Sequence, residues 1–324
     1  MNAWPAAQSA GEHGSMTQSL VSIMIVGTLC GAGGSSVDPV GLQAALDRAG
    51  FSPGIIDGRP GAKTRAALEA FQAYHGLPIT GEADSATVKA LKVDEHSALI
   101  RYTITAADKK LVDPPPRNWQ DKARRKRLGY KSLADLLIER GHCTRALLAR
   151  LNPKRNLDRL KVGDEVLLPF VWSDRSLPAA DRLEIDLDRK IVHVIDADGH
   201  VAALLHCSIA KDKHKRPKGS CKVISVAKNP VYLFDPKMWP EVKGVRQKLH
   251  IPPGPRNPVG LCWIGLSLPG YGIHGTPEPE MIGKTGSHGC FRLTNWDALR
   301  LAKMVDVGTP IRFRSADQAA FARR

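Results

Sequence analysis

The six cysteines of this 324-residue chain include no CxxC pair. Structural zinc sites usually take their ligands from such closely spaced pairs, so the spacing argues against one. A phosphate-binding loop, a zinc-finger pattern and an RNA-binding signature are missing as well. A chain of this length can bury its cores without a disulfide scaffold. We therefore expect no cofactor, no metal and no nucleic-acid partner, and cysteines that serve packing or chemistry.

Acidic residues are scarce relative to basic ones. The chain has 47 Lys and Arg against 32 Asp and Glu, which gives a formal net charge of +15. Such an excess is typical of proteins that meet an anionic partner, whether nucleic acid, a membrane surface or an acidic polymer. A surface that only keeps the protein soluble would explain the charge equally well.

The apolar run near the N-terminus is too short to span a bilayer, which takes about 20 apolar residues. Residues 20–30 read LVSIMIVGTLC and lead into small residues. This is similar to a secretory signal peptide without its basic start, and translation from Met16 would remove the polar preface. A buried helix or strand is the alternative. We expect residues 1–36 to be a signal peptide or disordered, and the protein to be periplasmic or secreted, without stable membrane insertion.

Residues 37–93, the first domain, show the pattern of a small helical unit. One helical stripe ends before Gly50 and a second before Gly76, and Asp84 is placed as the N-cap of a third helix. The pattern contains Leu42-x3-Leu46, Gly54-x2-Asp57-Gly58, Gly61-x2-Thr64, Ala67-Leu68-x2-Phe71-Gln72, Gly76-Leu77 and Thr80-Gly81-x2-Asp84. In these elements the block resembles the peptidoglycan-binding domain found on many wall enzymes. Most of these residues serve turns and core, so they identify a fold rather than glycan contacts.

Residues 99–172, the second module, predict the order strand, helix, helix, strand. A strand-like stretch surrounds Tyr102, Ser132 is placed as a helix N-cap, and Asn152-Pro153 closes a second helix. The closing Gly163-x2-Val166-x-Leu168-Pro169 and the Leu-Asn-Pro element resemble a lysin-motif glycan-binding module. Residues 108–128 interrupt the likeness between the first strand and the helices. The block is therefore predicted to be either a degenerate glycan-binding module or a brace between domains.

Residues 181–315, the third domain, change to a period of two. Leu183 and Ile185 alternate with charged residues, and two apolar runs flank a turn that ends in Gly199, which predicts a hairpin. Further apolar strands and one short helical pattern follow. We predict a multidomain α+β protein in which a mostly-β domain follows two small modules. Cys207 and Cys221 could be disulfide partners across adjacent strands.

The chemistry concentrates in one stretch of the third domain, which supplies His274, His288, Cys290 and Arg292. Nucleophilic cysteine catalysis needs a thiolate, a base that forms it, and donors that hold an oxyanion. A β-domain can bring a histidine at the end of one strand beside a cysteine at the start of the next. Buried packing and a metal site are the alternatives for these residue types.

A longer ordered pattern surrounds these residues. It comprises His274-Gly275, Ser287-His288-Gly289-Cys290-Phe291-Arg292, Pro255-Arg256-Asn257-Pro258-x-Gly260, Trp263-Ile264, Asn295-x-Asp297 and Gly308-Thr309-Pro310-Ile311. Over about 130 residues this resembles the L,D-transpeptidase catalytic domain. One departure is Arg216-Pro217-Lys218-Gly219, where members usually have a Thr-Pro-x-Gly turn.

The resemblance implies a role for each matching residue. Cys290 would attack a stem tetrapeptide, and His274 would be the proton acceptor and donor. The thiol would lose its proton either during attack or beforehand, as a standing ion pair. His288 would be a supporting group or the alternative base, and the backbone N–H of Cys290, with that of Gly289, would hold the oxyanion. The resemblance further implies substrate contacts for Arg292, Ser287, Gly275, Thr276, Asn257 and Trp263.

The activity implied is transfer of an acyl group between peptidoglycan stem peptides, which makes 3→3 cross-links in the cell wall. Water as the acceptor would make the enzyme an L,D-carboxypeptidase instead, and the sequence does not separate the two. A non-catalytic wall-binding protein is a further alternative, and loss of Cys290 or His274 would have favoured it. Peptidoglycan stem peptides and glycan strands are the expected partners.

Overall fold

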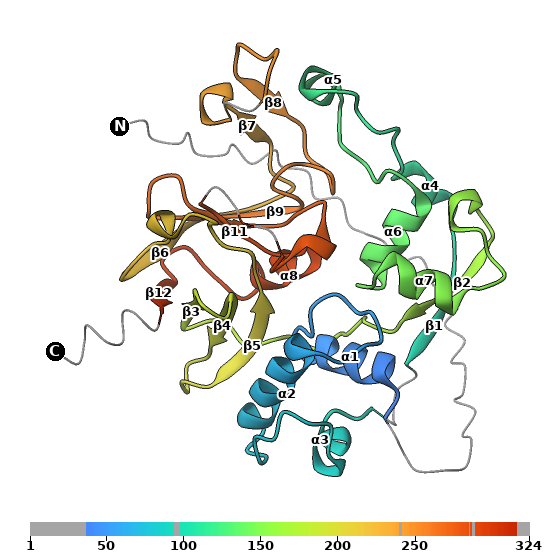
Figure 1. Ribbon diagram of the computed structural model, residues 1–324, viewed down its shortest axis with the longest axis vertical. Coiled ribbons are helices and arrows are strands. Elements are labelled where there is room, and N and C mark those ends of the chain that lie inside the picture. The colour runs from blue at the N-terminus through green and yellow to red at the C-terminus, as the bar shows by residue number, and fades with distance from the viewer. Residues whose placement is uncertain (1–36, 94–97, 240–241, 285, 287–288, 316–324) are drawn as a thin grey trace.

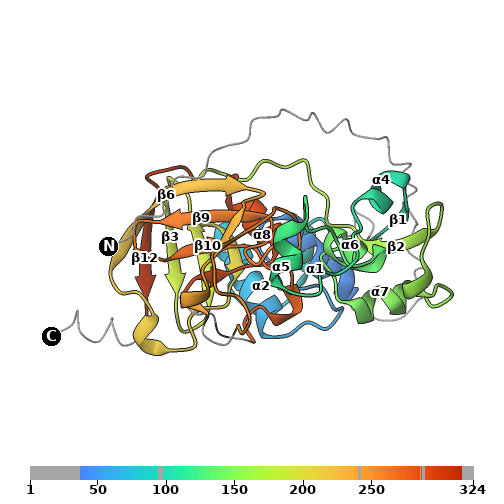
Figure 2. The same cartoon turned by 90° about the horizontal axis from the view of Figure 1, so that it is seen from above.

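The computed structural model describes residues 37–93, 98–239, 242–284, 286 and 289–315. Figures 1 and 2 show the third domain, built on a curled sheet, and the second module at opposite sides, with the first domain against both. The predicted signal segment lies outside the described residues. Within the described ranges, no helix has the length and apolar character that crossing a membrane requires.

Helices occupy each of the three stretches predicted in the first domain: α1 (Pro39–Arg48), α2 (Ala62–Tyr74) and α3 (Ser85–Ala90). Gly50 and Gly76 follow the first two helices with φ of 94° and 64°. These left-handed values suit glycine, which has no Cβ to clash there. The carboxylate of Asp84 accepts the N–H of Thr87 at 2.8 Å, as an N-cap does.

The second module pairs β1 (Leu99–Thr103) antiparallel with β2 (Glu165–Pro169). Between them lie α6 (Leu133–Arg140), α7 (Arg145–Leu151) and the 3-10 helix η1 (Leu157–Arg159). The hydroxyl of Ser132 caps α6, as the sequence predicts. The two predicted helices thus lie between the two predicted strands, but α4 and α5, described next, lie there as well, so the module has more helices than the sequence predicted.

The interrupting stretch of the second module contains α5 (Trp119–Arg124), and α4 (Ala106–Lys110) overlaps its start. It reaches across to the hairpin of β7 (Tyr232–Phe234) and β8 (Leu249–Ile251) in the third domain. Trp119 stacks on Phe234 with ring centroids 4.0 Å apart. Leu128 donates its N–H to the carbonyl of Pro253 at 2.8 Å. The insertion is thus a contact between domains.

The third domain contains one eight-stranded sheet, with the order β11-β10-β9-β6-β12-β3-β4-β5. Its strands are β3 (Arg182–Asp186), β4 (Ile191–Ile195), β5 (Val201–His206), β6 (Ser220–Lys228), β9 (Cys262–Leu266), β10 (Gly272–His274), β11 (Phe291–Arg292) and β12 (Pro310–Arg314). Neighbours are antiparallel except β10 with β11 and β12 with β3. The short helices are η2 (Lys213–Lys215), η3 (Pro236–Met238), η4 (Pro279–Met281) and α8 (Asn295–Leu301).

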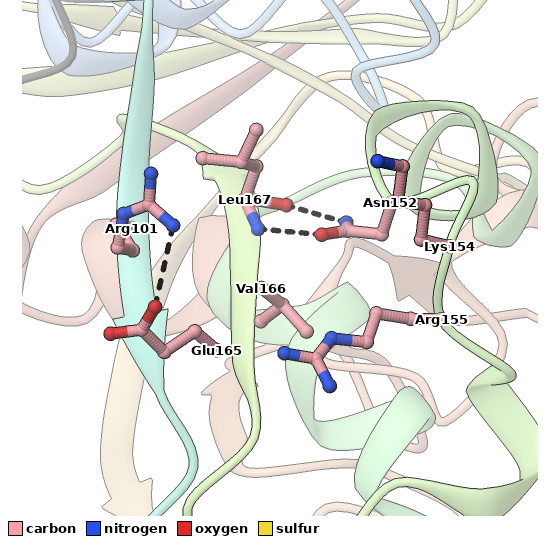
Figure 3. A pocket seen from close by; sticks show the side chains of 7 residues that line it. All are labelled: Arg101, Asn152, Lys154, Arg155, Glu165, Val166 and Leu167. Atoms are coloured by element: carbon pink, nitrogen blue, oxygen red, sulfur yellow. Dashed lines mark hydrogen bonds and ion pairs between the residues drawn. The ribbon is translucent and has the colours of Figure 1, made fainter.

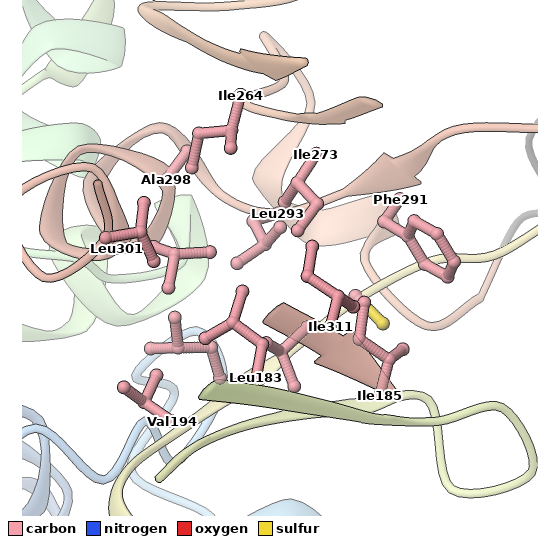
Figure 4. Packing of buried hydrophobic residues seen from close by; sticks show 14 of the residues in the cluster. Leu183, Ile185, Val194, Ile264, Ile273, Phe291, Leu293, Ala298, Leu301 and Ile311 are labelled. Carbon is pink, nitrogen blue, oxygen red and sulfur yellow. The ribbon is translucent and has the colours of Figure 1, made fainter. Parts of the chain in front are cut away.

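The period of two buries one face of this sheet. Leu183 and Ile185 of β3 are fully buried, and Ile273 and Phe291 meet them from the strands that carry the site. Leu301 of α8 closes the same cluster (Figure 4). Burying one such side chain contributes about 1.5–3 kcal/mol, so this core gives the site strands a firm base.

The two ends of the sheet meet. Ser208, just beyond β5, exchanges two backbone hydrogen bonds with Arg292 of β11, at 2.8 and 2.9 Å. The sheet therefore curls until its first and last strands are joined by this bridge. We call this place the seam, meaning Ser208 and Arg292 with the chain on either side of each.

The first domain shares a core with the third. Phe51 forms a parallel β-bridge with Leu204 of β5, and Ser52 donates its N–H to the carbonyl of Leu204 at 2.8 Å. Phe71 of α2 and Ile191 of β4 belong to the same apolar cluster. The first domain thus covers the edge of β5.

A buried charged cluster, which we call the junction, joins all three parts at α8. Arg300 donates to Asp47 of α1 at 2.7 Å and to Asp297 at 2.9 Å, and His142 of the second module lies 3.0 Å from Asp47. Burial alone would raise the pKa of Asp47, but the charges of Arg300 and His142 outweigh it and hold that pKa well below its usual range. Ser52 donates to Asp297 at 3.0 Å.

The disulfide hypothesis for Cys207 and Cys221 is wrong, since both are free thiols. Cys207 follows β5 and Cys221 lies on β6, and three strands separate these two in the sheet. Because β5 and β6 follow one another in the chain, the sequence suggested that they are neighbours in the sheet. In the structure β12, β3 and β4 lie between them, and the pairing of β12 with β3 joins segments that are far apart in sequence.

Candidate functional site

The site is built on two short parallel strands. In β10 and β11, Ile273 pairs with Phe291 and His274 with Arg292. Ile273 and Phe291 point into the core, so the alternate residues face the other way. His274 therefore shares a face with Arg292 and with Cys290, which precedes β11. The parallel pairing thus places on one face the three residues that the sequence singled out, whereas a direct hydrogen bond between the imidazole of His274 and the sulfur of Cys290 stays a prediction.

His274 is held in one orientation. Its ring is 6% exposed, and its Nδ1 lies 2.7 Å from the carbonyl oxygen of Gly275. A carbonyl can only accept, so Nδ1 carries the proton and Nε2 keeps a lone pair. Trp263 of β9 stacks on the ring, with centroids 5.7 Å apart and planes at 19°. The imidazole is thus prepared to accept a proton at Nε2.

Cys290 lies against the backbone of the strand that leads to His274. Its sulfur is 3.6 Å from the carbonyl oxygen of Gly270, and the N–H of Gly272 donates to it. Gly272 cannot carry a side chain, because a Cβ there would lie 2.4 Å from the ring of Trp263. Cys290 is partly exposed, unlike the buried Cys207 and Cys262. It is therefore neither sealed in the core nor fully on the surface.

Burial controls the ionisation of the pair. It raises the pKa of the Cys290 thiol to about 11, although the Gly272 amide and the Arg292 charge oppose the rise. It lowers the pKa of His274 to about 4, against the hydrogen bond to Gly275. Both shifts favour the uncharged forms near neutral pH. Burial therefore favours a thiol and a neutral imidazole at rest over a standing ion pair.

Arg292 joins the nucleophile to the seam. Its guanidinium donates to the carbonyl of Gly286 at 2.7 Å, and its backbone pairs with Ser208. Its charge lowers the pKa of both Cys290 and His274. A substrate carboxylate at Arg292 stays a prediction.

Three residues for which the resemblance implied substrate contacts are buried. Asn257 is fully buried, and its amide nitrogen donates to the carbonyls of Pro230, Ile251 and Pro252. Thr276 is buried and accepts the N–H of Glu278. Gly275 is buried against Asn295, and a Cβ there would lie 2.3 Å from the Asn295 Oδ1. The Asn257 amide and the Gly275 carbonyl are therefore bonded within the chain, and a substrate contact at any of the three residues stays a prediction.

Ser287 and His288 lie outside the described residues, so both predictions remain as they were. Gly289 is described, and a Cβ added to it would lie 3.7 Å from the ring of Tyr271. The oxyanion role of the Gly289 and Cys290 amides stays a prediction. The carbonyl of Gly275 was missed as an orienting group; a glycine directly after the histidine was the available signal.

Two family models match the chain. Residues 180–312 match an L,D-transpeptidase catalytic domain, and residues 36–91 match a putative peptidoglycan binding domain. These matches confirm both domain types predicted from the sequence. They also agree with the observed arrangement, a mostly-β curled sheet preceded by helical units.

Similar proteins carry the same description. A putative L,D-transpeptidase of Bacillus licheniformis is 27% identical over 168 residues, which cover 52% of this chain and 85% of that protein. One from Bacillus subtilis is 47% identical over 57 residues, covering 18% of this chain and 35% of that protein.

Among solved structures, an L,D-transpeptidase of Enterococcus faecium is 21% identical, with a TM-score of 0.32. The match covers 46% of this chain and 55% of the Enterococcus chain. This chain thus spans about half the length of that relative. A score this low adds nothing to the architecture described above.

Proposed function

We propose that this protein is a peptidoglycan L,D-transpeptidase, an acyltransferase that works through a cysteine acyl-enzyme outside the cytoplasm. Cys290 attacks the carbonyl between meso-diaminopimelate and D-alanine in a donor stem tetrapeptide. The C–N bond breaks, D-alanine leaves, and a thioester remains on Cys290. The amine of a second stem peptide then attacks the thioester, which frees Cys290 and forms a 3→3 cross-link.

One observation carries this proposal: the parallel register of β10 and β11 sets His274, Cys290 and Arg292 on one face. The Gly275 carbonyl leaves Nε2 of His274 as the basic atom. A thiol beside a fixed, neutral imidazole is the arrangement that nucleophilic cysteine catalysis uses. The family match over residues 180–312 supports the same reaction.

The proton follows from the ionisation states. Since burial keeps the thiol and the imidazole uncharged, His274 accepts the thiol proton as the sulfur attacks. The resulting imidazolium then donates that proton to the departing D-alanine amine. In the second half-reaction His274 takes a proton from the acceptor amine and returns it to the sulfur. Each proton therefore passes through one atom, Nε2 of His274.

The acceptor decides between transpeptidase and carboxypeptidase. Purified protein incubated with a disaccharide-tetrapeptide should yield cross-linked dimer and D-alanine, measured by mass spectrometry. Tripeptide without dimer would replace the transpeptidase with an L,D-carboxypeptidase that uses the same site. No product with this donor, from folded protein, would contradict both.

The two N-terminal units serve the wall substrate in this proposal. The first domain matches a peptidoglycan-binding family, and the second module is proposed to be lysin-motif-like and to contact glycan strands. A pocket of about 370 Å³ on the second module supports that role. It opens beside the β1–β2 pair and is lined by Arg101, Asn152, Lys154, Arg155, Glu165, Val166 and Leu167 (Figure 3). Its polar and cationic lining suits sugar hydroxyls and carboxylates.

A binding assay tests the second module separately. Replacing both Lys154 and Arg155 by Ala should lower the fraction of protein that sediments with purified sacculi. Arg159→Ala, an exposed residue of the same module outside the pocket, is the matched control. Equal sedimentation of both variants would leave the module as a brace between domains.

A further inference from the structure

The chain between β10 and β11 carries the nucleophile at its end, and three side chains hold its middle. Lys63 donates from Nζ to the carbonyl of Ile282 at 2.8 Å, and Lys190 donates to the carbonyl of Gly283 at 3.0 Å. Ser208 accepts the N–H of Gly283 at 2.8 Å. Lys190 and Ser208 belong to the third domain, but Lys63 lies in the first turn of α2 in the first domain. An accessory domain thus reaches the segment that presents Cys290.

The position of Lys63 is set by packing rather than by a surface charge pair. Lys63 is half-buried, and burial lowers the pKa of its amine, with the charge of Lys284 adding to the effect. Its stem packs against Gly54, where a Cβ would lie 2.8 Å from it. Nearby His206 of β5 is 5% exposed, and burial and then the Lys63 charge lower the pKa of His206 to about 3. The ammonium is therefore directed at the Ile282 carbonyl from a packed interface.

The held segment is tied directly to the seam. Ser208, which binds Gly283 through its hydroxyl, pairs through its backbone with Arg292. Arg292 follows Cys290 by two residues and faces His274 in register. Ile282 is 4% exposed, so it packs rather than drifting on the surface. A shift of Ile282 would consequently be felt at Ser208, Arg292 and the sulfur.

We infer that Lys63 is a positioning residue for the acyl-transfer reaction, and that the first domain is part of the catalytic unit as well as a wall-binding module. The inference rests on the proposed function for its activity readout. Lys63 touches no reacting atom; it acts through the carbonyl of Ile282. Replacing Lys63 should therefore also lower the rate of acylation by a small agent that contains no glycan. A loss of affinity for the wall could not explain such a result.

The test compares Lys63→Met with wild type in the full chain, using a carbapenem as the acylating agent. The limiting rate of acylation should fall by about tenfold or more, since small misplacements of reacting groups are costly, while the half-saturating concentration changes little. Lys63→Arg, which keeps a cation and a donor, should restore part of the rate. Lys89→Met, on exposed α3 of the same domain, is the control and should react like wild type.

Hydrogen exchange gives a readout that does not depend on activity. In Lys63→Met the amide of Gly283 should exchange faster than in wild type, while amides of β3 in the core stay protected. Unchanged exchange together with an unchanged acylation rate in folded Lys63→Met would overturn the inference. If wild type itself were not acylated, the proposed function would fail, and the exchange result would still decide the positioning claim. Should Lys63→Met not fold, Lys63→Gln serves in both measurements.

Discussion

The first domain meets the third in two places that differ in kind. At the junction, Asp47, Arg300, Asp297 and His142 form a cluster in which both carboxylates are almost fully buried. The other place is the active segment, by which we mean the chain from His274 to Cys290; there Lys63 makes a single hydrogen bond to the carbonyl of Ile282 from a half-buried position. At the junction several buried charged groups stabilise one another, whereas loss of the Lys63 contact would leave no buried ion.

The two kinds of contact should therefore affect different quantities: the junction the free energy of unfolding, and the Lys63 contact the rate of acylation. Removing one member of a buried charged cluster leaves its partners uncompensated, which costs far more than the loss of one exposed pair. Removing the Lys63 ammonium takes one donor from the neutral carbonyl of Ile282 and leaves no buried charge, while Lys190 and Ser208 still bind Gly283 next to it. We therefore expect substitutions at the junction to lower the free energy of unfolding, and substitutions at the active segment to lower the rate of acylation.

The largest effect is expected at the reacting end of the active segment. His274→Ala should lower the rate of acylation by a carbapenem about 10²–10⁴-fold, the range for a positioned acid–base group. His250→Ala, an exposed histidine on β8, is the control. A loss below about tenfold in the same assay would shift the base to His288. Thermal unfolding of both variants should resemble that of wild type, so that the loss at His274 is a loss of rate and not of stability.

At the junction, Arg300→Met should lower the free energy of unfolding by about 3–5 kcal/mol, because Asp47 and Asp297 lose their shared partner. Guanidinium titration measures it. The matched control is Arg189→Met, which removes the exposed contact of Arg189 with Glu69 between the same two domains. That variant should lose about 0.5 kcal/mol or less because solvent screens the pair. Equal losses would erase the distinction between the two kinds of contact.

His206 gives the interface near Lys63 a dependence on pH. Its pKa is about 3 in the folded protein and about 6.5 when unfolded, so the unfolded state gains the proton first as the pH falls. Its contribution is complete above about pH 6.5 and declines below, by about 2 kcal/mol at pH 5. His206→Leu should flatten this part of the stability curve, and exposed His200→Leu should not. Identical curves for both variants would contradict the buried neutral state.

The smallest effect concerns the pH dependence of acylation itself. The pKa of His274 is about 4 and that of Cys290 about 11, so neither group changes its charge between pH 5 and pH 8. The rate of acylation by a carbapenem should vary by less than about twofold over this range if His274 takes the proton during attack. A steep rise with pH would mean that free thiolate is the reacting species.

Local chemistry let the sequence predict much of the fold. The alternation around Leu183 predicted a strand, Gly50 and Gly76 predicted helix ends, and Asp84 predicted a cap. These features depend on residues a few positions apart. In the second module the two predicted helices α6 and α7 are present, but α4 and α5 were not predicted.

The site was less accessible to the sequence. Its residue types were recognised, but the parallel pairing of β10 with β11 and the bridge from Ser208 to Arg292 join residues far apart in the chain. Asn257 and Lys63 show the same limit. From the sequence alone, an amide or an ammonium is expected at the surface, and only the packed structure shows which backbone carbonyl it binds. Contacts between domains have no local pattern from which to infer them.

The most direct measurement identifies the atom that carries the acyl group. Wild-type protein and Cys290→Ala are each incubated with a tetrapeptide donor, digested, and mapped by mass spectrometry. We predict an acyl adduct on the wild-type peptide that contains Cys290 and none anywhere in the folded variant. An adduct on Cys221 or another thiol, or one that persists in Cys290→Ala, would contradict a nucleophile built at the seam of the sheet.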